Sequence, residues 1–282
     1  MKFKVSAELG YDVRSSSTIV LNIHALRTAH QTILSESLTI SPAIDAEELT
    51  NITTENRFVR LDIPEPGNYN IRYEAVVDNC FEVRSYAEYS ETPLGSIDAG
   101  VFVYLNPSRY CQSDKLYRLA ENTFGKIKGN YNKVVAITRW IHQNVEYLSG
   151  FSNSETSAYD TVTQQAGVCR DFAHLGIALC RALTIPARYF TGYSYMLIPQ
   201  DFHACFEAYI GNQWLLFDAT RLAPLNGLVK IATGRDAADA AIASIFGNVF
   251  SINTKASCEM FENEPFVPVY YPPSVYDAYT YS

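Results

Sequence analysis

The chain has 282 residues, of which 48% are hydrophobic, and its formal net charge is −8 at pH 7. This apolar content suffices for one or two packed cores and argues against intrinsic disorder. An acidic chain without a basic run does not suit a nucleic-acid backbone, so we expect no nucleic-acid partner. No apolar run has the length of a membrane span, and the first residues lack the apolar stretch of a signal peptide. We therefore expect no membrane partner and a cytoplasmic location.

The first part of the chain has the alternating pattern of half-buried strands. Apolar and polar residues alternate over 3–9, 19–25 and 69–77, and the turn-forming segment 64–68 precedes the last of these. Several short strands with turns between them predict an antiparallel β-sandwich over residues 1–105. We interpret His24 and His30 there as strand and loop residues, and we expect no catalytic residue in this part.

Helical spacing replaces the alternation near residues 105–107 and marks a second predicted domain, 106–282, with an α+β fold. Ser157 has the residue type and position of a helix N-cap. The predicted helix over 169–183 is apolar on most of its surface, which indicates a helix buried in the middle of its domain. The elements expected here are helices over 130–144, 157–166 and 169–183, strands over 185–195, 202–210 and 213–219, a small-residue helix over 237–245, and an extended tail over 258–281.

Cysteines occur at positions 80, 111, 169, 180, 205 and 258 and form no C-x-x-C pair. A structural zinc site is therefore not expected, and in a reducing compartment the thiols stay free. Cys169 differs from most of the others because it begins the buried helix, where the positive end of the helix dipole stabilises a thiolate. We interpret Cys80, Cys111, Cys180 and Cys258 as small buried hydrophobic residues.

A predicted hairpin brings a histidine next to a carboxylate. Gly211-Asn212 is a two-residue hairpin signal, and it places Cys205 opposite Asp218, with His203 and Asp218 as diagonal neighbours on one face. The carboxylate would fix the imidazole tautomer, and the imidazole would activate or pair with a thiolate. A purely structural His–Asp pair is the alternative interpretation.

Residues 167–189, together with 201–209 and 213–220, resemble the transglutaminase-like superfamily, and more narrowly the bacterial transglutaminase-like cysteine proteases. The resemblance implies a papain-like core with a cysteine on a helix and a histidine and an aspartate on adjacent antiparallel strands. It gives Cys169 the position of the nucleophile, His203 that of the general base and Asp218 that of the orienting acid.

Two positions depart from the family pattern. The family often has Trp two residues after the histidine, where this chain has Cys205, and often has Pro after the aspartate, where this chain has Ala219. Because a smaller side chain beside the thioester should open the cleft to water, we expect hydrolysis to exceed transfer to an amine. For the oxyanion hole, we expect the backbone N–H of Cys169 and a side-chain donor, with Gln164 and Gln165 as candidates.

The leading hypothesis is a cysteine protease or amidase that cleaves a peptide or isopeptide amide through a thioester acyl-enzyme. It would act on a peptide or protein substrate and need no cofactor or metal. One alternative is a transglutaminase, which passes the acyl group to an amine, and another is a non-catalytic peptide-binding scaffold with the same fold. A metal site built from Cys169, His203 and Cys205 is disfavoured, because the sequence offers no fourth ligand.

Overall fold

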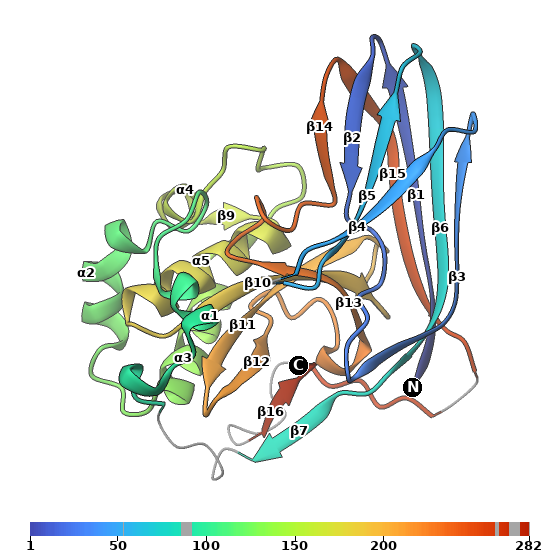
Figure 1. The fold of residues 1–282 in the computed structure, drawn as a ribbon. Coiled ribbons are helices and arrows are strands. Elements are labelled where there is room, and N and C mark those ends of the chain that lie inside the picture. Colours follow the sequence, from blue (N-terminus) through green and yellow to red (C-terminus); the bar gives the residue numbers. More distant parts are fainter. Residues whose placement is uncertain (53, 86–91, 263–264, 271–276, 282) are drawn as a thin grey trace.

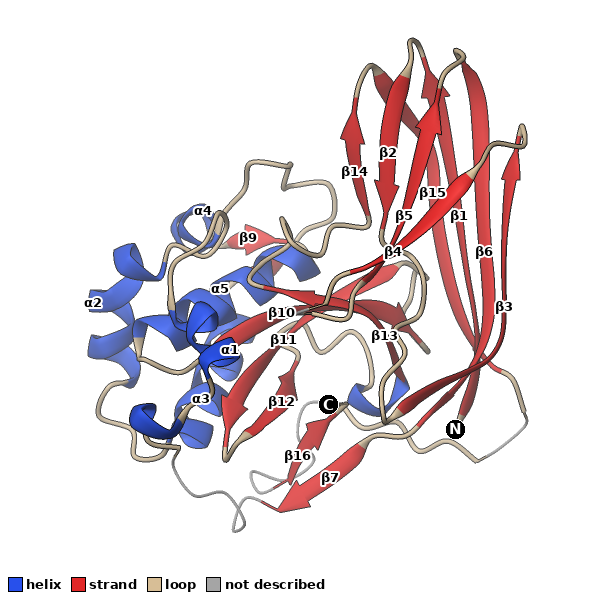
Figure 2. Ribbon diagram, viewed as in Figure 1, coloured by secondary structure: helices blue, strands red, loops and turns tan. Residues whose placement is uncertain are grey.

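The computed structural model describes residues 1–282 except 53, 86–91, 263–264, 271–276 and 282 (Figure 1). A tall β-sandwich stands beside a mixed α/β body, and the longer helices gather on the side away from the sandwich (Figures 1 and 2). The α+β fold class and the β-rich N-terminal part are as predicted. Within the described residues, none of the helices combines the length and the apolar character needed to cross a membrane.

The sandwich consists of two four-stranded sheets, with strand orders β15-β1-β6-β3 and β14-β2-β5-β4. Alternate residues of β1, from Phe3 to Leu9, are buried, as the period of two predicts. The strands are β1 (Lys2–Val13), β2 (Ser17–Leu21), β3 (Gln31–Ser41), β4 (Ala46–Thr50), β5 (Arg57–Ile63), β6 (Gly67–Asn79), β14 (Ala243–Phe246) and β15 (Val249–Met260).

Strand pairing crosses the predicted boundary at residue 105. β15 pairs with β1 along most of its length, and β14 pairs with β2. In the other direction, β7 (Glu82–Ser85) pairs with β16 (Asp277–Thr280) at the edge of the sheet in the α/β body. The division into domains 1–105 and 106–282 stays a prediction, but neither segment supplies all the strands of its own sheets.

The α/β body is built on a six-stranded sheet with strand order β13-β10-β11-β12-β16-β7. Helix α5 (Cys169–Ala182) lies close against this sheet. A Cβ atom added at Gly176 would be 2.5 Å from Cε1 of Phe206, so glycine is needed for the close approach of helix and strand. The remaining elements are helices α1 (Ala99–Phe102), α2 (Ser113–Phe124), α3 (Asn130–Asn144) and α4 (Ala158–Gln164); short 3-10 helices η2 (Leu94–Ser96), η3 (Val103–Leu105) and η4 (Leu225–Gly227); and strands β8 (Glu146–Tyr147), β9 (Ala166–Gly167), β10 (Ala187–Ser194), β11 (Phe202–Ile210), β12 (Gln213–Phe217) and β13 (Leu228–Gly234).

Most predicted elements of the second part are confirmed, and one is wrong. α3 has the predicted bounds, and Ser157 caps α4 through a capping box with Asp160. The small-residue helix predicted over 237–245 does not form. Arg235 instead pairs with Asp239 at 2.8 Å in a turn, and the residues of β14 pair with the edge of β2. Long-range strand pairing has overridden the local helix propensity of the alanines.

The hairpin between β11 and β12 has the predicted register. Gly211 and Asn212 have φ values of 61° and 63°, the left-handed conformation that a type I′ turn requires at both central residues. Ile210 therefore pairs with Gln213, and Phe206 pairs with Phe217. This register places alternate residues of both strands on the same face of the sheet.

Candidate active site

Cys169 lies at the first position of α5, and its side chain is partly exposed as a free thiol. The helix start is held by Asp171, whose carboxylate accepts a hydrogen bond from the backbone N–H of Val168 at 2.9 Å. Asp171 also pairs with Arg170 at 3.0 Å. A thiol in this position has the positive end of the helix dipole beside it.

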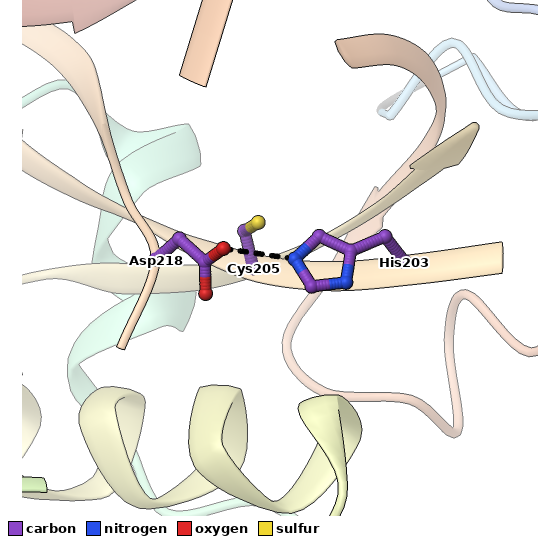
Figure 3. A group of neighbouring side chains, drawn as sticks. All are labelled: His203, Cys205 and Asp218. Carbon is purple, nitrogen blue, oxygen red and sulfur yellow. Dashed lines mark hydrogen bonds and ion pairs between the residues drawn. The ribbon is translucent and has the colours of Figure 1, made fainter. Parts of the chain in front are cut away.

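His203 and Asp218 form a buried pair on adjacent strands. The distance between His203 Nε2 and Asp218 Oδ2 is 2.9 Å, and the dashed line in Figure 3 marks this contact. The other carboxylate oxygen, Oδ1, accepts hydrogen bonds from the backbone N–H and the hydroxyl of Thr220, at 2.8 and 2.7 Å. Both oxygens of Asp218 are therefore fixed, and with them the orientation of the imidazole ring.

The surroundings of His203 favour its protonated form. Burial opposes the charged ring, but the neighbouring acidic groups Cys205 and Asp218 and hydrogen bonds to Asp218 and Cys169 hold the pKa of His203 well above its ordinary value. Since Nε2 faces Asp218, Nδ1 is the ring nitrogen left for Cys169. The structure thus brings together Cys169, His203 and Asp218, the three residues that the sequence singles out.

Cys205 lies beside this pair, as the hairpin register predicts. Its sulfur sits above the contact between Asp218 and His203 in Figure 3, and ligand atoms of the three residues lie within 4.8 Å of one another. The Cys205 side chain is only 1% exposed and packs in an apolar cluster with Phe190 and Leu216. The expectation that Cys205 opens a cleft is therefore wrong, since this residue faces the interior rather than the surface around Cys169.

The two glutamines proposed for the oxyanion hole are both exposed. Gln164 ends α4, and Gln165 follows it in the left-handed conformation with a φ of 55°. The backbone carbonyl of Gln165 accepts a hydrogen bond from Glu146 at 2.8 Å. Their role as side-chain donors stays a prediction.

The sequence analysis missed Tyr147, which lies next to the nucleophile position. β8 and β9 form a two-stranded parallel ladder in which Tyr147 pairs with Gly167, two residues before Cys169. The backbone N–H of Cys169 lies near the Tyr147 hydroxyl and lowers its pKa. Burial, together with the charge of a Cys169 thiolate, raises the pKa of Tyr147 to about 12, so its hydroxyl keeps its proton at neutral pH. A ladder of two residues per strand has no readable sequence period, which is why the pattern gave no signal.

A helix that begins with a cysteine, packed against antiparallel strands that carry a histidine and an aspartate, defines a transglutaminase-like fold. Residues 1–99 match the family described as bacterial transglutaminase, N-terminal domain, and residues 117–219 match the transglutaminase-like superfamily. The chain belongs to the transglutaminase-like superfamily.

Two relatives illustrate the match. A solved structure from Cytophaga hutchinsonii, provisionally described as a cysteine protease, is 54% identical and has a TM-score of 0.96. The similarity covers 100% of this chain and 98% of that one. An uncharacterized protein of Mycobacterium leprae is 30% identical over 116 residues. That match covers 38% of this chain and 42% of the relative, so the chain spans less than half the length of that protein.

Proposed function

We propose that this protein is a cysteine hydrolase that cleaves peptide or isopeptide amides through a thioester acyl-enzyme. One observation carries the proposal: a buried imidazole is oriented by Asp218 at 2.9 Å, and the thiol that begins α5 lies close enough to raise the pKa of that imidazole. Many proteins have a buried His–Asp pair or a free thiol. Their combination at a helix N-terminus is the arrangement that nucleophilic thiol catalysis requires.

In the proposed reaction, the sulfur of Cys169 attacks the amide carbonyl carbon while its proton resides on His203. His203 then donates that proton from Nδ1 to the leaving amine, the C–N bond breaks, and a thioester remains on Cys169. A water molecule gives its proton back to His203 and attacks the thioester, which releases the acid and the thiol. Asp218 holds the ring in place and stabilises its positive charge throughout.

Two donors are available for the negative charge that develops on the carbonyl oxygen. The backbone N–H of Cys169 is one, and the protonated hydroxyl of Tyr147, which already lies at that N–H, is the other. We infer that the substrate oxygen takes the place of the Tyr147 hydroxyl at the backbone N–H of Cys169. The oxygen then accepts one hydrogen bond from that N–H and one from the hydroxyl. Tyr147 thereby becomes a further candidate for the role that the sequence assigned to Gln164 or Gln165.

One relative supports cleavage over transfer: the Cytophaga hutchinsonii protein is provisionally described as a cysteine protease. The match that covers the site, residues 117–219, is to the transglutaminase-like superfamily, so transfer stays the alternative. Water is accordingly the proposed acceptor, and a peptide or protein is the proposed substrate. Transfer of the acyl group to an amine is the competing outcome of the test below.

The first test measures thiol reactivity at pH 6 by brief treatment with iodoacetamide, followed by mass spectrometry of the peptides. We expect Cys169 to be labelled faster than Cys80. Cys80 is exposed, so its interpretation as a buried hydrophobic residue is wrong, and it serves as the internal control. His203→Ala should remove this advantage. Equal rates at Cys169 and Cys80 in the wild-type protein would argue for a non-catalytic scaffold.

The second test identifies the acceptor. A library of peptide amides is incubated with the protein, with and without excess primary amine, and the products are identified by mass. Free acid as the main product under both conditions supports hydrolysis. An excess of the amine adduct would instead identify a transglutaminase, and the absence of both products with a reactive Cys169 would reject peptide amides as substrates.

A further inference from the structure

We propose that His203, Cys205 and Asp218 form a binding site for a thiophilic divalent cation such as Zn²⁺, and that occupancy of this site switches off the reaction. The inhibitory consequence rests on the proposed function, whereas the binding of the ion does not. The site differs from the nucleophile, because its sulfur ligand is Cys205 rather than Cys169.

The geometry supplies three ligand atoms around one point. A ring nitrogen of His203, the sulfur of Cys205 and a carboxylate oxygen of Asp218 all lie within 4.8 Å of one another, and Nε2 is the nitrogen that faces Asp218. All three residues are at most 2% exposed. In Figure 3 the sulfur stands over the line that joins the carboxylate to the ring. Among the residues that the structure describes, this is the group of acidic, histidine and cysteine side chains close enough to share a metal ion.

The three ligand types favour zinc or cadmium over calcium or magnesium. Thiolate and imidazole are the ligands that soft and borderline ions prefer, while calcium and magnesium require mostly oxygen ligands. Three protein ligands with water in the fourth position form a common zinc arrangement. Asp218 was not part of the metal site considered from the sequence, although the predicted hairpin already places it beside His203 and Cys205.

The charges also balance in the interior. Cys205 lies against an apolar cluster that includes Phe190, Leu216 and Tyr281, where a lone charge would be costly. With a divalent cation bound, the two negative ligands, the Cys205 thiolate and the Asp218 carboxylate, offset its two positive charges.

Proton accounting explains why the bound ion would block catalysis. The ion takes the lone pair of Nε2 and the sulfur of Cys205, so the Nε2 proton and the thiol proton leave to solvent. The neutral ring then carries its remaining proton on Nδ1, the nitrogen that faces Cys169. The ring then lacks the positive charge that stabilises the Cys169 thiolate, and its hydrogen bond to Asp218 is lost.

The binding test uses Co²⁺ as a spectroscopic substitute for zinc and the full-length Cys169→Ala protein, which lacks the nucleophilic sulfur. We expect one equivalent of Co²⁺ to produce a thiolate-to-cobalt charge-transfer band, which excess Zn²⁺ removes and excess Ca²⁺ does not. The band should disappear in Cys169→Ala/Cys205→Ala and remain in Cys169→Ala/Cys258→Ala, which removes a buried thiol of the sandwich instead. A folded Cys169→Ala protein without the band, or a band that survives the loss of Cys205, would overturn the proposal.

The inhibition test compares the zinc sensitivity of the wild-type protein and Cys205→Ala, each relative to its own activity without zinc. We expect the zinc concentration for half-inhibition to rise at least about tenfold in Cys205→Ala. Equal sensitivity would show that zinc acts at Cys169 and would overturn the inhibitory role. If the wild-type protein cleaves no amide at all, the proposed function fails, and the cobalt titration still decides whether the site exists.

Discussion

Two of the polar clusters in the part of the chain that the structure describes each centre on a buried basic side chain, and they differ in what that side chain contacts. In the sandwich, Arg57 is 3% exposed and lies between Glu36 and Glu48. Its Nε donates to Glu48 at 2.8 Å, Nη1 donates to Glu36 and to the carbonyl of Ala25 at 2.9 Å, and Nη2 donates to Glu36 at 2.9 Å. In the α/β body, His203 is equally buried but engages Asp218 with only one ring nitrogen, while the other serves a partly exposed thiol.

This difference separates a stabilising network from a reactive one. The guanidinium of Arg57 donates its hydrogen bonds to Glu36, Glu48 and a backbone carbonyl, and so joins the edge strands β3 and β4 of the two sheets. A buried histidine whose second ring nitrogen faces an accessible thiol can exchange a proton with the substrate that the thiol attacks. The following substitutions test this contrast, in order of decreasing expected effect.

Cys169→Ala should abolish amide cleavage, with a fall of about 10⁴-fold or more, because no other group can form the thioester. Folding should be nearly unaffected, since a small, partly exposed side chain is lost. The checks are turnover with a peptide amide and the midpoint of thermal unfolding. Cleavage retained within tenfold would contradict the assignment of the nucleophile.

Asp218→Asn should slow cleavage on the order of 10³-fold, by less than His203→Ala does, because the ring loses its orientation and its charge partner but remains present. The pKa of His203 should fall toward its ordinary 6.5, since the carboxylate charge that favours the imidazolium is gone. A histidine with a raised folded pKa adds stability that is complete below pH 6.5 and is lost as the pH rises through the folded pKa. NMR titration of His203 and unfolding at several pH values measure both effects, and an unchanged His203 pKa would show that Asp218 does not stabilise the charged ring.

Arg57→Met should lower the free energy of unfolding by about 1.5–3 kcal/mol, because Glu36 and Glu48 lose charge-assisted hydrogen bonds while Glu36 keeps Arg27 and Tyr73 as partners. The matched control is Arg60→Met on the same strand, whose exposed ion pairs should contribute less than about 1 kcal/mol. Denaturant unfolding measures both. Equal losses of unfolding free energy in the two variants would mean that the ion pairs of Arg57 contribute no more than exposed ion pairs do.

Tyr147→Phe should lower the rate constant for cleavage about 100-fold with little change in substrate affinity, as removal of one oxyanion donor does. The control is Tyr159→Phe, a change at an exposed tyrosine of α4. Single-turnover kinetics separate binding from chemistry. A change in affinity alone would make Tyr147 a wall of the substrate site, and Gln164→Ala and Gln165→Ala would then test the two glutamines.

Glu36→Gln should cost about 1–2 kcal/mol of stability at pH 7, a figure reduced for the partial exposure of the carboxylate. Burial alone would raise the pKa of Glu36, but hydrogen bonds and the charge of Arg57 lower it to about 2. The carboxylate therefore adds stability that is present above its ordinary 4.5 and is lost as the pH falls toward 2. The difference between wild type and variant should shrink over this range in acid unfolding, and a constant difference would rule out the charge as its cause.

The sequence by itself determined the features that depend on neighbours along the chain. The period of two predicted the strands of the sandwich, and the apolar helix predicted that Cys169 begins a buried element. The Gly211-Asn212 turn fixed the register that sets His203 beside Asp218, because a two-residue type I′ turn leaves one way to pair the strands.

Only the tertiary structure decided the features in which distant segments meet. The segment 237–245 has the composition of a helix, but its last residues pair with β2 as the start of β14, and β15 pairs with β1. Tyr147 reaches Cys169 through a two-residue ladder, and Cys205 turns into an apolar interior rather than toward the surface. Local patterns carry the periodicity of one element, whereas these contacts depend on which elements pack together, and that choice is made by the burial of the whole chain.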